Sequence, residues 1–216
     1  MLGIISVWLV CIFNTNIYAR EIIDMTGRRV EIPDTINKVY SPSPTGETIL
    51  YSIDHKLLCG LLFQMRDVEK QMLHPDMRQL PVVGSLTGEG GLSANKEFLL
   101  NARPDLILLV IRDENGIYAD PFASRAEETL LEMAPCVYIY ARDLRDYPEA
   151  YDFLGDILNR RERTDELAAY IRGALNDAAD VVAQVPPDQR PKVYYAEQPD
   201  GLATENATSY HTALLN

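Results

Sequence analysis

Candidate ligand-binding side chains follow the predicted strands of this chain at several separate points. They combine hydroxyl groups, glycine backbone, arginine guanidinium groups and one tyrosine. Arginine pairs well with the carboxylate or catecholate groups of an anionic chelate, and tyrosine can stack on a ligand or bind iron through its phenolate. Each residue alone is typical of an ordinary surface group, and only the shared position at strand ends favours a site. The candidates are Ser41, Ser43, Thr45, Gly88, Gly90, Arg112, Tyr118, Arg142 and Arg145.

The three histidines are the other candidates, because neutral imidazole is a common ligand for transition metals. His211 stands near a predicted helix start. It either ligates a metal or a chelate's open coordination position, or hydrogen-bonds to nearby backbone, and the residues leave both roles open. His55 in a polar turn and His74 before Pro75 are predicted to be solvated loop residues. The chain has no Cys-x-x-Cys or His-x-x-x-His pair, so a structural zinc site is not predicted.

Alternating strands and helices must position these residues. The pattern predicts a hairpin over 21–32 and strands over 38–40, 57–62, 80–83, 106–111 and 134–140, with helices over 48–53, 95–103 and 124–133. Two prolines exclude a helix before Thr45, so the loop after the first strand lies at its carboxyl end. In open α/β sheets such loops face the ligand crevice. We therefore predict a doubly wound, mostly parallel α/β lobe.

After Pro148 the apolar spacing becomes helical. It predicts two helices separated by the polar patch 159–163. The second helix is expected to run to about Val185, roughly 33 Å, which is long enough to link two lobes. Three prolines then stop it, and a strand over 192–196 is expected to follow.

Two phrases resemble one known family. The stretch D-M-T-G-R-R-V-E-I-P at 24–33 resembles the mature amino terminus of periplasmic binding proteins of ABC importers for iron-siderophore, haem and cobalamin. The stretch 95–108, N-x-E-x-x-L followed by P-D-L-I-L, resembles the same family. The resemblance implies a binding protein, not an enzyme, that works as a monomer with an inner-membrane permease. It implies no cofactor and a ligand that is an iron complex, with haem, cobalamin or a nickel chelate as alternatives.

The resemblance also assigns roles to particular residues. Glu97 matches the acid that docks against permease arginines. The phrases D-G-L-A-T at 200–204 and S-Y-H-T at 209–212 match the start of a second lobe, where Ala213 replaces the expected glutamate. A complete second lobe needs about 100 further residues. A truncated chain that binds ligand weakly is therefore expected; alternatively, residues 193–216 fold back on the first lobe.

The expected organisation is a signal peptide over 1–19, an amino-terminal lobe over 20–147, linking helices over 148–187 and the start of a second lobe over 188–216. The apolar run 2–13 is too short to span a membrane comfortably, and polar residues 14–16 and the small Ala19 follow it, which favours secretion to the periplasm. Lipidation at Cys11 and a buried amino-terminal helix are the alternatives. Cys59 and Cys136 lie in separate apolar segments and are predicted to be buried free thiols, with a disulfide as the alternative.

Composition and motifs exclude several classes of protein. The net charge of −12 disfavours nucleic acid as a partner, because phosphate binding needs clustered lysine and arginine. The glycine-rich stretch 87–91 lacks the lysine of a P-loop and the spacing of a dinucleotide turn, and the chain has no G-x-S-x-G elbow. The rival class is a fragment of an α/β enzyme subunit whose active site lies elsewhere.

Overall fold

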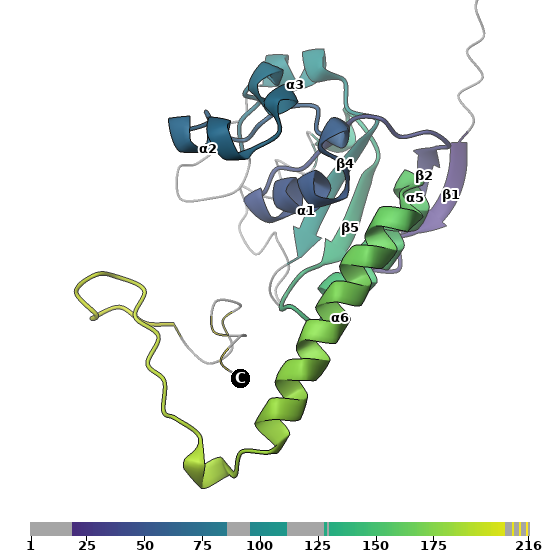
Figure 1. Ribbon diagram of the computed structural model, residues 1–216. Helices are drawn as coiled ribbons and strands as arrows, with labels where there is room; N and C mark the ends of the chain where they lie inside the picture. The colour runs from purple at the N-terminus through teal and green to yellow at the C-terminus, as the bar shows by residue number, and fades with distance from the viewer. Residues whose placement is uncertain are drawn as a thin grey trace, which may run out of the picture.

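The central sheet is parallel, as the alternation of strands and helices predicts (Figure 1). The computed structural model describes residues 19–85, 96–111, 128, 130–205, 209, 212 and 215. Three strands lie in the order β3–β4–β5, with bounds Val39–Tyr40, Leu106–Ile111 and Cys136–Tyr140. Because parallel neighbours share their direction, the carboxyl ends of all three strands lie at one edge of the sheet.

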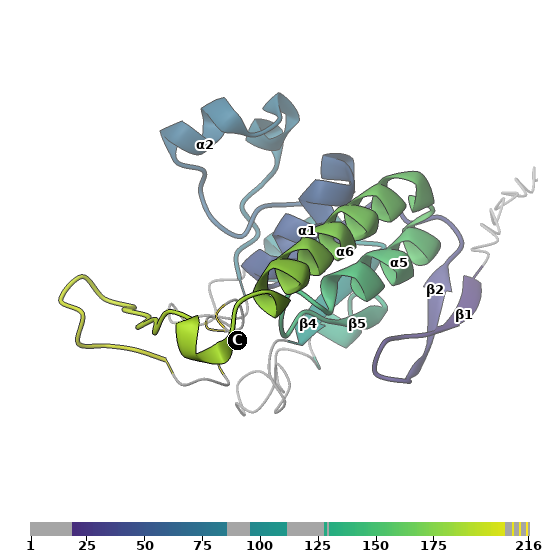
Figure 2. The ribbon, with the colours of Figure 1, turned by 60° about the horizontal axis from the view of Figure 1, so that its bottom comes forward.

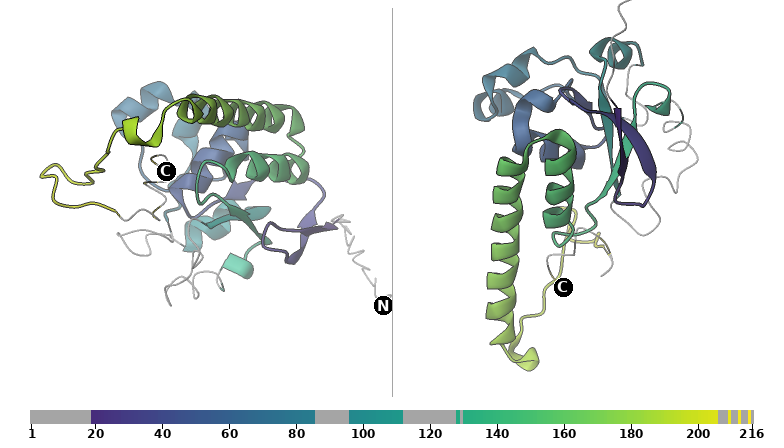
Figure 3. Two further views of the ribbon diagram at one scale, coloured as in Figure 1. Left: turned by 90° about the horizontal axis from the view of Figure 1, so that it is seen from below. Right: turned by 90° about the vertical axis from the view of Figure 1, so that its right-hand side faces the viewer.

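The strand β4 is buried on both faces, which explains its unbroken apolar run. Leu108 and Val110 pack in a core with α1 (Pro44–Asp54) and α5 (Tyr147–Leu158). Ile107 and Leu109 pack in a second core with Leu99 of α3 (Lys96–Ala102). Figure 3 shows α1 and α5 on one side of the sheet and α3 on the other. The predicted doubly wound lobe is confirmed.

Two predicted strands are shorter in the structure than expected. The segments 57–62 and 80–83 contribute only isolated parallel bridges, from Leu58 to Val39 and from Leu61 to Val82. Gly60 lies so close to Val83 that a Cβ atom there would be 2.6 Å from a Val83 methyl group. The 3-10 helix η1 (His55–Leu57) also occupies the start of the first segment. These residues therefore continue the parallel sheet beyond β3 without forming a regular ladder.

The helix α1 begins earlier than predicted, at Pro44. Ser43 is its N-cap and accepts a hydrogen bond from the Gly46 N–H at 3.2 Å. Proline at the first helical position needs no hydrogen bond from its nitrogen, so Pro44 starts the helix instead of excluding it. The short helices α2 (Asp67–Met72) and η2 (Pro75–Gln79) follow in the chain between the segments 57–62 and 80–83.

The helices α5 and α6 (Arg161–Ala183) form an antiparallel pair beside α1, as Figure 2 shows. A Cβ at Gly155 would lie 2.1 Å from the Thr164 Oγ1, so only glycine permits this close crossing. The 23 residues of α6 carry the chain past the carboxyl edge of the sheet (Figure 1). It ends two residues before the predicted Val185. None of the helices in the described ranges is both long and apolar enough to cross a membrane.

The predicted strand over 192–196 does not form. After the 3-10 helix η3 (Pro187–Gln189), residues 191–197 have no regular secondary structure. The backbone hydrogen bond from Glu197 to Ala203 closes a turn there, and Val193 and Tyr194 are exposed. A strand needs a neighbour to satisfy its backbone groups, and no described segment pairs with this one.

The predicted hairpin is confirmed as β1 (Ala19–Ile23) and β2 (Arg29–Pro33). Asp24 is buried in its turn and accepts hydrogen bonds from the Thr26 hydroxyl at 2.6 Å and from the Arg28 Nε at 3.1 Å. Gly27 has a φ of 85°, which favours glycine. Arg28 also donates to the Cys136 carbonyl at 2.9 Å. The phrase D-x-T-G-R therefore fixes the hairpin against β5.

Candidate ligand-binding site

In the first candidate loop, which follows β3, the two serine hydroxyl groups make hydrogen bonds within the protein. Ser41 is buried and donates to the Leu108 carbonyl at 2.8 Å, which joins the loop to β4. Ser43 is buried as the cap of α1. Thr45 is half-buried in the first turn of α1. The two serines shape the carboxyl edge of the sheet, and Thr45 is the more accessible hydroxyl of the three.

Two buried hydrogen bonds tie this loop to the start of the glycine-rich stretch. The Tyr40 hydroxyl donates to the Gly84 carbonyl at 2.9 Å, and Ser85 donates to the Pro42 carbonyl at 2.7 Å. Gly84 has a φ of 86°, which turns the chain at this point. The structure thus brings the loops after β3 and after Val83 together. Gly88 and Gly90 lie outside the described residues.

The two arginines after β5 are exposed at the same edge. The Arg142 guanidinium donates two hydrogen bonds to the Asp146 carboxylate, both at 2.9 Å, and lies over the Tyr140 ring at 4.5 Å; the Arg142 backbone N–H donates a third to that carboxylate at 2.8 Å. The hydrogen bond from Arg142 holds the pKa of Asp146 below its usual range, although partial burial acts in the opposite direction. Arg145 lies 3.6 Å from Asp143. Arg142 is therefore oriented by its partner while about half of its side chain stays accessible.

The remaining candidates are placed less completely. Arg112, Tyr118 and His211 lie outside the described residues, so their grouping with the loops above stays a prediction. Glu97 is exposed in the first turn of α3, as a docking residue requires. Cys59 and Cys136 are buried thiols outside any disulfide, as predicted, and burial raises the pKa of Cys59 to about 12.

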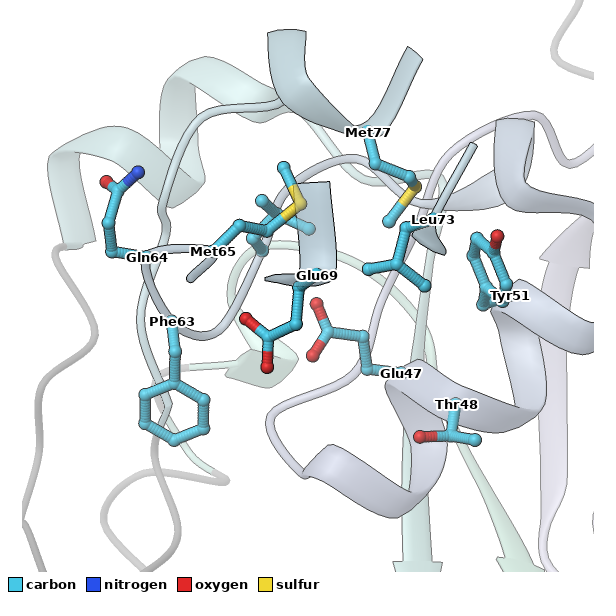
Figure 4. Close-up of a pocket in the computed structure, with 10 residues that line it drawn as sticks. Glu47, Thr48, Tyr51, Phe63, Gln64, Met65, Glu69, Leu73 and Met77 are labelled. Atoms are coloured by element: carbon cyan, nitrogen blue, oxygen red, sulfur yellow. The ribbon is translucent and has the colours of Figure 1, made fainter. Parts of the chain in front are cut away.

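A cavity of about 330 Å³ lies between α1 and the segment 61–77, and sequence reasoning missed it (Figure 4). Its walls combine apolar side chains with two carboxyl groups, those of Glu47 and Glu69. The residues that line it are Glu47, Thr48, Tyr51, Leu61, Phe63, Gln64, Met65, Glu69, Leu73 and Met77. The two acids are separated by a helix and an irregular segment, so no spacing in the sequence indicates that they meet.

The pKa values of the two acids are shifted in opposite directions. Burial raises the pKa of its carboxyl above the usual range, the Leu62 N–H at 3.3 Å lowers it, and the Glu69 carboxylate raises it further. Glu69 pairs with Arg66 at 2.6 Å, and those hydrogen bonds lower its pKa. The cavity is therefore acidic, whereas the sheet edge near β5 carries arginines. An anionic ligand is disfavoured beside the two acids of the cavity, while Arg142 and Arg145 each pair with an aspartate.

Comparisons with solved structures identify the fold. An ABC-transporter solute-binding protein from Sulfurospirillum deleyianum has a TM-score of 0.76 and 26% identity, over 91% of this chain and 59% of that protein. The molybdate periplasmic binding protein MolA of Haemophilus influenzae has a TM-score of 0.63 and 22% identity, over 84% and 59%. The siderophore-binding protein BauB, solved with acinetobactin and ferric iron, has a TM-score of 0.57 and 14% identity, over 78% and 56%.

These likenesses confirm, at the level of the fold, the family that the two sequence phrases predict. The three matched proteins are binding proteins of transporters, not enzymes. The present chain spans 59% of the length of the first two. No family model and no curated protein matches the chain.

Proposed function

We propose that this chain, which has the fold of the periplasmic solute-binding proteins of ABC importers, is the solute-binding component of such an importer. The observation that carries the proposal is the likeness to a solute-binding protein over 91% of the chain at a TM-score of 0.76. The carboxyl edge of the sheet supports it, since the edge combines the loop after β3 with the arginines after β5. Open parallel sheets bind ligands at this edge.

The ligand that we propose is an anionic iron complex of the siderophore type. Arg142 is oriented by Asp146, which takes its Nε and Nη2 donors, and about half of its side chain is accessible, so the Nη1 N–H groups can reach a carboxylate or catecholate. Arg145, three residues further on, adds a second positive charge. The other arginine and the tyrosine of the predicted site, Arg112 and Tyr118, would complete this side of the crevice. Haem, cobalamin and a nickel chelate are the competing ligands.

Calorimetric titration with one complex of each kind distinguishes these ligands. The expected result is saturable one-to-one binding of a ferric siderophore, with much weaker binding of haem, cobalamin and the nickel chelate. Preferential binding of one of the other three would replace the iron assignment but keep the carrier function. Chemical conversion of a bound complex would instead favour the rival enzyme class.

The delivery step that we propose uses Glu97 as a contact for arginines of the permease. Its place in the first turn of α3 leaves the carboxylate at the surface.

We further propose that residues 1–19 direct the chain to the periplasm and that residues 20–147 form the first lobe. Residues 148–187 would link this lobe to a second one, and residues 188–216 would begin the second wall of the crevice. His211 would face the ligand from that wall.

A further inference from the structure

His55 meets His74 and Asp76 at the surface next to the acidic cavity, although it lies 19 residues before His74 in the sequence. The Nε2 of His55 lies 3.3 Å from the Oδ2 of Asp76, and the Nδ1 of His74 lies 3.5 Å from the same oxygen. All three donor atoms lie within 4.8 Å of one another. The two histidines, which were predicted to be solvated loop residues, are partly accessible, and their rings stack with their centres 3.8 Å apart.

We propose that these three side chains bind one divalent transition-metal ion, with zinc as the best match. Two imidazole nitrogens and one carboxylate oxygen are a donor set that zinc accepts, whereas magnesium and calcium prefer oxygen alone. Ligand atoms about 2.1 Å from a tetrahedral ion lie about 3.4 Å apart. The two distances to the Asp76 oxygen already have this value. Water would occupy the remaining position.

Metal binding requires one of the two imidazole rings to turn, and the exposed ring can do so. The rings are inclined by only 26°, so one of them must turn to aim its lone pair at a shared ion. His74 is the ring that can turn, because about 45% of its side chain is exposed. Its Nδ1 accepts a long hydrogen bond of 3.3 Å from the Asp76 N–H, and the ion would take that lone pair.

The backbone around the cluster is already held in place. His55 begins η1, while His74 caps η2 and Asp76 lies in its first turn. The His74 N–H donates to the Tyr51 hydroxyl at 3.0 Å, which joins η2 to α1. A bound ion would therefore join the two ends of the segment 56–73, which lies between His55 and His74. Tyr51, Leu73 and Met77 also line the acidic cavity, so the ion would stiffen one of the cavity's walls.

Zinc titration of the full chain, followed by calorimetry, tests the site independently of any transported ligand. We expect one equivalent to bind and the His55→Gln, His74→Gln and Asp76→Asn variants each to lose at least about tenfold in affinity. Asp188→Asn, which changes an exposed acid in the first turn of the 3-10 helix η3, is the control and should bind as the original protein does. Circular dichroism in EDTA checks that all variants fold.

Cobalt replaces zinc in a second measurement that reports the donor atoms. We expect visible d–d bands without a thiolate charge-transfer band, because neither Cys59 nor Cys136 belongs to the cluster. Zinc binding that is absent, or equally strong in the three cluster variants, would overturn the proposal and leave Asp76 as the partner of two histidines without a metal. A thiolate band would also overturn it. None of these results bears on the carrier function.

Discussion

Asp24 is the residue on which the hairpin most depends. It accepts hydrogen bonds from Thr26 and Arg28 and is buried against β5. Burial alone would raise the pKa of Asp24, but the hydrogen bonds from Thr26, Arg28 and Tyr138 outweigh it and leave the pKa below its usual range. A carboxylate with a lowered pKa stabilises the fold above its unfolded pKa and stops doing so as pH falls through its folded pKa.

We expect Asp24→Asn to lower the free energy of unfolding at pH 7 by about 2 kcal/mol, because the Arg28 guanidinium loses its acceptor. The loss should shrink as pH falls below about 4, because the Asp24 carboxyl of the unfolded chain is then protonated first and the folded one follows at lower pH. Urea unfolding at several pH values measures it. Asp188→Asn, at an exposed position in η3, should change little. Equal losses in both variants would contradict the role of Asp24.

Glu47 should behave in the opposite way, because its pKa is raised. Its ionisation opposes folding above the folded pKa and costs nothing below the unfolded pKa. Glu47→Gln should therefore raise the melting temperature at pH 7 and leave it nearly unchanged at pH 3.5. Glu149→Gln is the matched control, since Glu149 is an exposed acid in the first turn of α5. A Glu47→Gln variant no more stable than this control at pH 7 would show that the cavity imposes no electrostatic cost.

At the scale of elements, the crossing of α5 and α6 depends on Gly155. A Cβ there would meet Thr164, whereas a Cβ at Gly173 meets nothing within 4 Å. We expect Gly155→Ala to destabilise the protein by about 1–3 kcal/mol through overpacking. Gly173→Ala should stabilise it by roughly 0.5–1 kcal/mol through helix propensity. Thermal unfolding of both variants is the measurement, and a shift of the same sign in both would contradict the close crossing.

The elements with strong periodicity could be predicted from the sequence, and those that depend on distant contacts could not. Strand β4 was predicted with its observed bounds, and the end of α6 was predicted within two residues, because an apolar run and flanking prolines are local signals. The start of α6 was predicted less well, since Arg161 lies inside the polar patch that was expected to separate the two helices. The strand over 192–196 does not form, because a ladder needs a neighbour that the local sequence does not reveal, and the segment 57–62 contributes only isolated bridges to the sheet.

The candidate site shows the same division. The chain order places Ser41 and Arg142 after strands, and parallel topology brings those ends to one edge. The sequence does not show that the Ser41 hydroxyl donates a hydrogen bond to β4 or that Arg142 pairs with Asp146. Nor does the sequence show that Glu47 lies near Glu69 or that His55 stacks on His74, because the path of the irregular segments between them decides both contacts.

At the scale of the whole molecule, the lobe must both hold a ligand and present a surface to a permease. Charge reversal by Glu97→Arg should abolish ligand uptake in cells that carry the permease, without changing ligand affinity. Glu162→Arg reverses an exposed acid in the first turn of α6 and is the control. Uptake of radioactive iron complex and calorimetry of the purified variants measure the two effects. Undiminished uptake by the Glu97 variant would reject the docking role.

The most direct test of the carrier function is an equilibrium titration of the protein and its Arg142→Gln variant with a ferric siderophore. Arg161→Gln is the matched control, because Arg161 makes a similar two-point contact with Asp156 near the other end of α5. The account predicts one-to-one binding, a loss of at least about tenfold in Arg142→Gln, which equals about 1.4 kcal/mol, and recovery of the complex unchanged. Absence of binding to any metal complex, or equal affinity in Arg142→Gln and Arg161→Gln, would contradict it.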